Sequence, residues 1–124
     1  MSRNLKISKQ MITETAEKLG WTVDFGDQRN SSGKLDKYVE FFKMSPAGED
    51  FGFCVFYDTL ADIADEVESF YSGFDIEEHV SMWLDGKRHG TSGVPDIVTL
   101  VNDAKEIESM ILELSEALQA TIWG

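Results

Sequence analysis

The chain has 124 residues, of which 42% are hydrophobic and 11% aromatic, as is typical of one globular domain with a modest core. These values exclude a two-domain enzyme and a chain that is mostly disordered, so we expect a single domain over residues 1–124. Cys54 is the only cysteine, which excludes an internal disulfide. No apolar run is long enough to span a bilayer, and residues 1–20 lack the apolar centre of a signal peptide. We therefore expect a cytoplasmic protein.

The charge is unusual in both size and position. Eleven Lys and Arg face 23 Asp and Glu, which leaves a net charge of −12. Residues 44–86 contain no Lys or Arg and eleven of the acids. Such a field repels nucleic-acid phosphates and anionic lipid, so we expect no direct nucleic-acid or membrane binding and instead a protein partner with a basic surface. The alternative is that the acidic surface only keeps the protein soluble.

The first third of the chain predicts one helix and one strand. Ser8 is placed to cap a helix over residues 9–19, whose apolar positions recur at spacings of three and four, and Gly20 is placed to end it. The alternation from Trp21 to Phe25 then predicts a half-buried strand. The polar residues 26–33 predict a loop, which we expect to be the most mobile segment.

Two aromatic-rich strands, at residues 38–44 and 51–57, follow. The residues between them include Pro46 and Gly48, which suit the turn of an antiparallel hairpin. Both faces of the strand at residues 51–57 are largely apolar. We therefore expect that strand to be central in the sheet, covered by helices on at least one side, with Cys54 as a buried structural thiol.

The acidic middle of the chain predicts two short helices. Thr59, three residues before Asp62, indicates a helix to about Tyr71, and Asp75 is placed to cap a helix over residues 76–86. The predicted buried side of the second helix consists of Ile76, Val80, Trp83 and Leu84. The acids lie off the apolar faces, although capping accounts for some of them. We expect the partner-binding residues to be Asp62, Asp65, Glu66, Glu68, Glu77, Glu78 and Asp85.

The last predicted helix begins at Pro95 and Asp96 and has the clearest periodicity in the chain. Its apolar seam follows alternating spacings of three and four, through Ile97, Leu100, Ala104, Ile107, Ile111, Leu114 and Leu118. Further apolar residues beside the seam widen it to the stripe of a helix packed within a domain. Val98 and Leu112 lie outside the stripe and leave room for a homodimer contact. The expected fold is α+β in the order α-β-β-β-α-α-α, with a three-stranded antiparallel sheet against which the helices pack.

The sequence contains parts of several catalytic and metal-binding patterns, but each pattern lacks a necessary residue. A nucleophilic Cys54 needs an exposed thiol and a His partner, and the positions of Asp75, His79 and His89 match no known metal-binding spacing. The glycine-bracketed loop at residues 87–93 lacks the Gly-Lys-Ser/Thr ending of a phosphate-binding loop. We therefore expect no catalytic residue, metal or cofactor. Two alternatives stay open: a small-ligand or metal-dependent enzyme that uses this loop and His79, and a homo-oligomeric accessory protein.

Two stretches carry a resemblance to known proteins. Residues 45–53, Ser-Pro-Ala-Gly-Glu-Asp-Phe-Gly-Phe, and Trp83-Leu84-Asp85 with the glycines and proline at 90, 93 and 95 resemble small acidic proteins carried by phages and conjugative elements of gut bacteria. That genetic setting includes antirestriction and anti-CRISPR proteins. The resemblance implies a non-enzymatic inhibitor that occupies the basic groove of a nucleic-acid-binding enzyme. No catalytic residue is implied.

Overall fold

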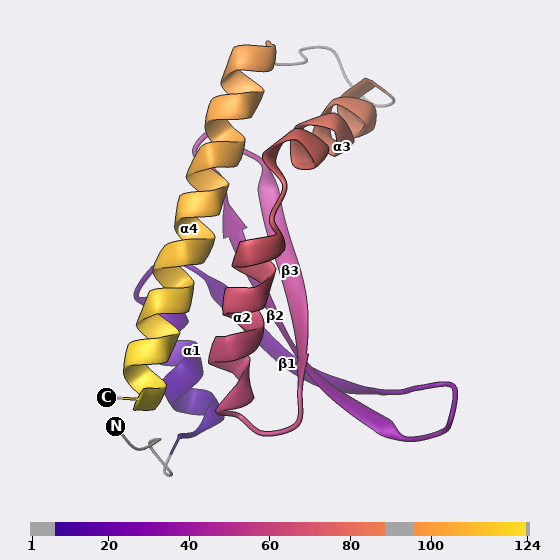
Figure 1. Ribbon diagram of the computed structural model, residues 1–124, viewed down its shortest axis with the longest axis vertical. Helices are drawn as coiled ribbons and strands as arrows, with labels where there is room; N and C mark the ends of the chain where they lie inside the picture. The colour runs from indigo at the N-terminus through magenta and orange to yellow at the C-terminus, as the bar shows by residue number, and fades with distance from the viewer. Residues whose placement is uncertain (1–6, 89–95, 124) are drawn as a thin grey trace.

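The computed structural model describes residues 7–88 and 96–123 (Figure 1). It confirms the α+β class and the predicted order of elements. The elements are α1 (Lys9–Glu17), β1 (Thr22–Arg29), β2 (Leu35–Met44), β3 (Asp50–Tyr57), α2 (Asp62–Gly73), α3 (Ile76–Arg88) and α4 (Ile97–Trp123). None of the helices in this part of the chain has the length and apolar character needed to cross a membrane.

The three strands form one antiparallel sheet in the order β1-β2-β3. The prediction that residues 51–57 form the central strand is therefore wrong: β2 is central and β3 lies at an edge. An apolar run on both faces suggests a strand covered on both sides, but it does not say how many strands pair with it. In this sheet the second apolar face of β3 is exposed to solvent.

The predicted loop at residues 26–33 is also partly wrong. Gly26 to Arg29 continue β1 and pair with Leu35 to Tyr38 of β2. The turn itself is short, because the Asn30 side chain accepts hydrogen bonds from the backbone N–H groups of Ser32 and Lys34, at 2.9 and 3.1 Å. This end of the hairpin is polar and largely exposed. Its sequence therefore lacks the alternation of apolar and polar residues that predicts a strand.

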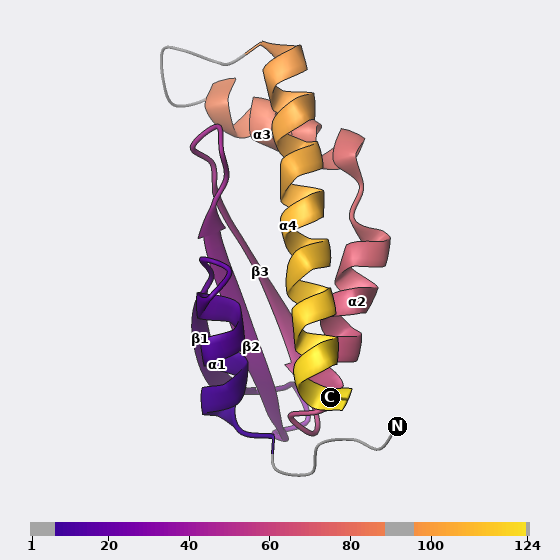
Figure 2. The same cartoon turned by 90° about the vertical axis from the view of Figure 1, so that its left-hand side faces the viewer.

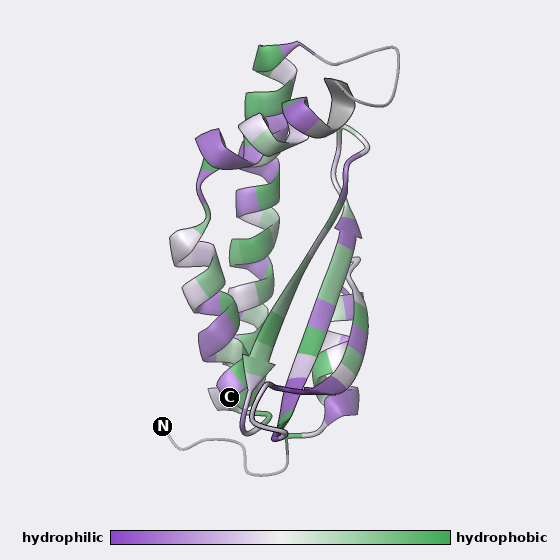
Figure 3. Ribbon diagram, turned by 90° about the vertical axis from the view of Figure 1, so that its right-hand side faces the viewer, coloured by the Kyte–Doolittle hydropathy of each residue, from purple (hydrophilic) through white to green (hydrophobic). Residues whose placement is uncertain are grey.

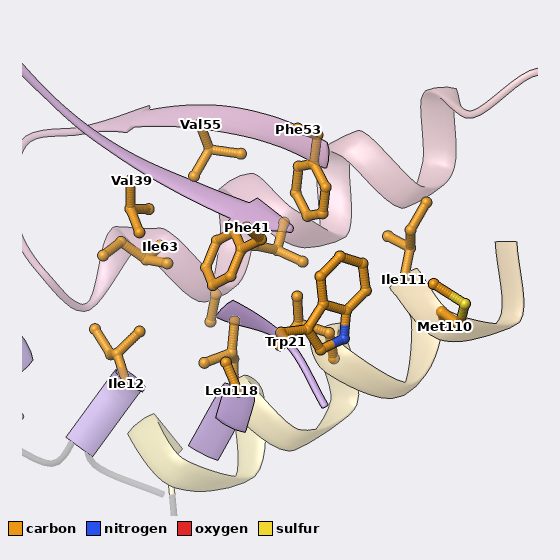
Figure 4. Close-up of a cluster of buried hydrophobic side chains, with 14 of the residues drawn as sticks. Ile12, Trp21, Val39, Phe41, Phe53, Val55, Ile63, Met110, Ile111 and Leu118 are labelled. Carbon is orange, nitrogen blue, oxygen red and sulfur yellow. The ribbon is translucent and has the colours of Figure 1, made fainter. Parts of the chain in front are cut away.

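Helices cover one face of the sheet. Helix α4 lies alongside α2 and α1, and Figures 1 and 2 show these three helices on the same side of the strands. Between the two layers lies a core to which the inner residues of β2 and β3, such as Val39, Phe41, Phe53 and Val55, contribute (Figure 4). Trp21, just before β1, is 2% exposed and packs edge-on against the ring of Phe53 at a centroid distance of 5.7 Å.

The apolar stripe of α4 is confirmed over most of its length. Leu100, Ala104, Ile107, Ile111, Leu114 and Leu118 are all 0% exposed. The prediction for Ile97 is wrong, since this residue is 59% exposed in the first turn of the helix. Helix α3 crosses the N-terminal part of α4, and its Val80 and Trp83 form a second small core with Leu100 and Ala104. Val98 and Leu112 are exposed, as predicted.

The predicted caps at Ser8 and Asp75 are confirmed, since these side chains accept the backbone N–H groups of Met11 and Glu78. Asp96, predicted only as the start of the last helix, accepts the Thr99 N–H in the same way. At α2, the Asp62 carboxylate accepts the Thr59 N–H at 2.9 Å, which is one of the two hydrogen bonds of the predicted capping box. Helix α2 itself begins at Asp62, so Thr59 lies in the turn before it.

Candidate functional site

The carboxylates predicted to bind a partner lie on α2 and α3. Asp62 is half-buried, and the other six are exposed: Asp65, Glu66, Glu68, Glu77, Glu78 and Asp85. Among the described residues, none of these six forms an ion pair with a Lys or Arg. Within the described residues, the charge of these six carboxylates is therefore not paired with a basic side chain.

These carboxylates have several different surroundings. Asp65 and Glu68 both accept hydrogen bonds from the Gln119 amide of α4, at 3.1 and 3.0 Å. Asp62 and Glu66 line a hollow that also includes Lys34 and Lys37 at the β1–β2 hairpin. On α3, Glu77 borders a hollow with Glu108 of α4, whereas Glu78 lines a separate groove beside β3.

We call this last feature the β3 groove. Its volume is about 530 Å³, and it is lined by Glu49, Asp50, Phe51, Gly52, Phe53, Cys54, Phe70, Gly73, Phe74, Asp75, Glu78, His79 and Met82. Its apolar side includes Phe53 and Phe70, whose rings stack in parallel at a centroid distance of 4.2 Å. Among the described residues, four carboxylates and no Lys or Arg line the groove, so it suits a ligand that is cationic and partly apolar.

An acid–histidine pair lies at one end of the β3 groove. His79 Nε2 of α3 is 2.8 Å from Glu49 Oε2 in the turn between β2 and β3. The imidazole also packs against Phe51 and Phe74, at centroid distances of 5.6 and 5.3 Å. In the described part of the chain, no three His, Cys, Asp or Glu side chains come together as metal ligands. His89, the other histidine considered, lies outside that part.

The sequence analysis missed a buried carboxylate behind the same turn. Asp103 of α4 is 3% exposed. Its two oxygens accept hydrogen bonds from the Ser45 hydroxyl at 2.6 Å and from the Ala47 N–H at 2.9 Å. The signal was present, because Asp103 is a charged residue three positions after Leu100 and directly before Ala104, on the buried stripe. The turn that carries Glu49 is thus bonded to both α4 and α3.

Cys54 was predicted to be buried and is exposed. It points to the outer face of the sheet, opposite Glu40 of β2. The helices form only one layer, so this face is uncovered, and Phe42, Phe56 and Met44 are 37%, 47% and 60% exposed. Partial burial, and then the charge of Glu40, raise the pKa of the Cys54 thiol.

The glycine-bracketed loop at residues 87–93, which the alternative enzyme hypothesis uses, is only partly described. Lys87 and Arg88 belong to the end of α3. Residues 89–93, which include His89 and both glycines of the motif, lie outside the described residues.

Comparison of the chain with protein-family models, with curated proteins and with solved structures finds no match. The fold and the surface define a class of protein: a small α+β domain with exposed carboxylates on α2 and α3 and an acidic groove along an edge strand.

Proposed function

We propose that the protein is a non-enzymatic binding module whose acidic helices, α2 and α3, dock on a basic surface of another protein. The observation that carries this proposal is the set of six exposed carboxylates on these helices, none of which is ion-paired with a described Lys or Arg. Carboxylates that are held on helices present fixed negative charge. Such charge steers a cationic partner into contact and gives an association rate that falls as salt is added.

The narrower form of the proposal concerns the partner. Carboxylates in front of Lys and Arg clusters replace phosphates, so the favoured partner is a host defence nuclease whose nucleic-acid groove the protein occupies. The module would then be a counter-defence inhibitor, of the anti-CRISPR or antirestriction kind, acting in the cytoplasm. The resemblance to proteins of phages and conjugative elements supports this form, together with the net charge of −12.

A second candidate is a homo-oligomeric accessory protein. It is favoured by two exposed apolar residues on α4, Val98 at 65% and Leu112 at 36%. They lie two heptads apart on one side of the helix, where a second copy could pack. Sedimentation of the wild-type protein and of a Val98→Ser, Leu112→Ser variant distinguishes this candidate, which predicts a dimer that the double substitution dissociates.

The test of the main proposal compares two variants with the same charge change. In the first, Asp65→Asn, Glu66→Gln and Glu68→Gln neutralise the exposed acids of α2. In the control, Glu17→Gln, Glu106→Gln and Glu113→Gln neutralise three exposed acids on α1 and α4. All six side chains are exposed, so both variants should keep the fold, which circular dichroism checks.

Each form serves as bait for proteins of the host lysate, and the captured protein is then purified for affinity measurements at low and high salt. We expect the α2 variant to bind it much more weakly than the wild type does, the control to bind nearly as well, and all three affinities to fall with salt. Equal affinities for the two variants, or binding that salt does not weaken, would contradict the proposal. Inhibition of the captured protein's nucleic-acid binding tests the narrower form.

A further inference from the structure

The outer edge of β3 has backbone groups that could pair with another strand. Strand β3 pairs with β2 alone, in an unbroken register from Asp50 to Tyr57. In an antiparallel pair every second residue turns its N–H and C=O away from its partner strand. Among the described residues, no group outside β2 forms a hydrogen bond with the main chain of residues 51–57. These outward backbone groups are free to pair.

This edge also lacks the features that usually protect an exposed strand. Edge strands are commonly blocked by Lys, Pro or a bulge. The sequence of β3, Asp-Phe-Gly-Phe-Cys-Val-Phe-Tyr, contains neither Lys nor Pro, and its pairing with β2 shows no bulge. Figure 3 shows that β3 is coloured mostly as hydrophobic. An exposed apolar edge of this kind either promotes aggregation or binds a partner.

The β3 groove runs along the first half of this edge and determines which strand fits. The groove carries the apolar rings of Phe70 and Phe74 and the exposed Met82, which is 65% accessible. A strand added to β3 would turn alternate side chains toward these residues. Figure 1 shows β3 starting near α3 and running beside α2, the two helices that supply them.

The charges around the groove select the occupant. Its described lining contains Glu49, Asp50, Asp75 and Glu78 and no Lys or Arg. A second copy of the chain would also carry a net charge of −12 and the same acidic groove, so two copies that met along this edge would repel each other. A segment with Lys or Arg residues would be attracted instead.

We propose that the β3 groove binds an extended segment of a partner protein, with alternating apolar and basic residues, which adds to the sheet as a strand beside β3. The apolar side chains pack against Phe70, Phe74 and Met82. The basic side chains turn to the other face of the added strand, where they lie beside Asp50 and within the negative field of the groove's carboxylates. This inference rests on the proposed function only for the positive charge of the partner. The added strand would bind through the backbone of β3, whereas the proposed docking of α2 and α3 does not involve that backbone.

The probe is a terminally blocked peptide of alternating Val and Arg, about as long as β3. Two further peptides carry N-methyl groups, one on every Val amide and the other on every Arg amide. Both keep the charge of the parent, but each removes the backbone donors from one side of the strand. Only one side can face β3, so we expect one methylated peptide to bind at least about tenfold more weakly than the parent and the other to bind nearly as well.

Hydrogen exchange measured by NMR locates the bound peptide. We expect every second amide from Phe51 to Val55 to gain protection when the parent peptide is added. Met82→Lys should weaken binding severalfold, because it places a positive charge in the groove. Ser81→Lys adds the same charge at the adjacent exposed position, outside the groove, and should weaken binding less.

Three outcomes would overturn the inference. The first is no binding of the parent peptide. The second is equal binding of both methylated peptides, with NMR changes only at the exposed acids of α2 and α3. That result would still agree with the proposed function. The third is protection of β3 amides that rises with protein concentration and without peptide, which would make a second copy the occupant. The α2 variant described above should still bind the parent peptide, because its three substitutions lie outside the groove.

Discussion

Asp103 joins the longest helix to the turn between β2 and β3. The carboxylate accepts from Ser45 and Ala47, and the Ser45 hydroxyl oxygen in turn accepts the Glu49 N–H at 2.9 Å. Glu49 then reaches His79. One buried side chain on α4 thus helps to position the acid–histidine pair at the end of the β3 groove.

Replacing Asp103 by Ala should destabilise the protein by about 1–3 kcal/mol, because a buried hydroxyl and a backbone N–H would lose their acceptor. Asn102→Ala, at the adjacent exposed position, is the control and should change the free energy of unfolding by less than about 0.5 kcal/mol. Urea denaturation of both variants measures the difference. Equal stabilities would show that the turn does not depend on this carboxylate.

The Cys54 thiol should react with a disulfide reagent in the native protein, because the side chain is exposed on the outer face of the sheet. Its pKa is raised by partial burial and then by Glu40. At neutral pH the native thiol should therefore react more slowly than the thiol of the unfolded chain, and the rate should rise with pH as the thiolate forms. Glu40→Gln should speed the reaction. A thiol that reacts only after denaturation would contradict this assignment.

At the level of elements, the core depends on the packing of the inner face of the sheet against α4. Phe53 on β3 is 8% exposed and stacks on Phe70, whereas Ile107 on α4 is 0% exposed. Both belong to the same hydrophobic cluster. Strand β3 therefore has one face in the core, while its free edge borders the groove.

Phe53→Ala and Ile107→Ala should each lower the free energy of unfolding by about 2–5 kcal/mol, since each removes a large buried side chain. Val98→Ala, on the exposed side of α4, should change it by no more than about 0.5 kcal/mol. Chemical denaturation monitored by tryptophan fluorescence gives all three values. A loss below about half a kcal/mol at Phe53 or Ile107 would mean that the residue is not packed as described.

For the molecule as a whole, the dominant property is a net charge of −12. Most of the exposed acids named above have no Lys or Arg partner among the described residues, so they repel one another in the folded state. Added salt shortens the range of that repulsion, with the Debye length falling from about 30 Å at 0.01 M to about 3 Å at 1 M.

The melting temperature should therefore rise as a non-stabilising salt such as NaCl is added. The variant with Asp65, Glu66 and Glu68 neutralised should melt higher at low salt and respond less to added salt. Differential scanning calorimetry over the same salt series measures both effects. A melting temperature that falls with salt would mean that attractive ion pairs, and not repulsion, dominate the surface.

Where a local rule applies, the sequence alone predicted the structure. The caps at Ser8 and Asp75 and the buried stripe from Leu100 to Leu118 were predictable, because a cap involves residues three apart and a helix repeats its faces every few residues. The order of elements and the α+β class followed from the same periodicities. The exposure of the acidic residues also followed from their place off the apolar faces.

Only the tertiary structure decided how these elements meet. Whether β3 is central or at an edge, and hence whether Cys54 is buried, depends on how many strands pair and how many layers of helices cover them, and no pattern within eight residues of strand encodes this. The bonds from Asp103 to Ser45 and from Glu49 to His79 span 58 and 30 residues. The β3 groove joins residues 49–54 to residues 70–82. Contacts over such separations arise from chain topology, so their geometry appears only once the helices are packed on the sheet.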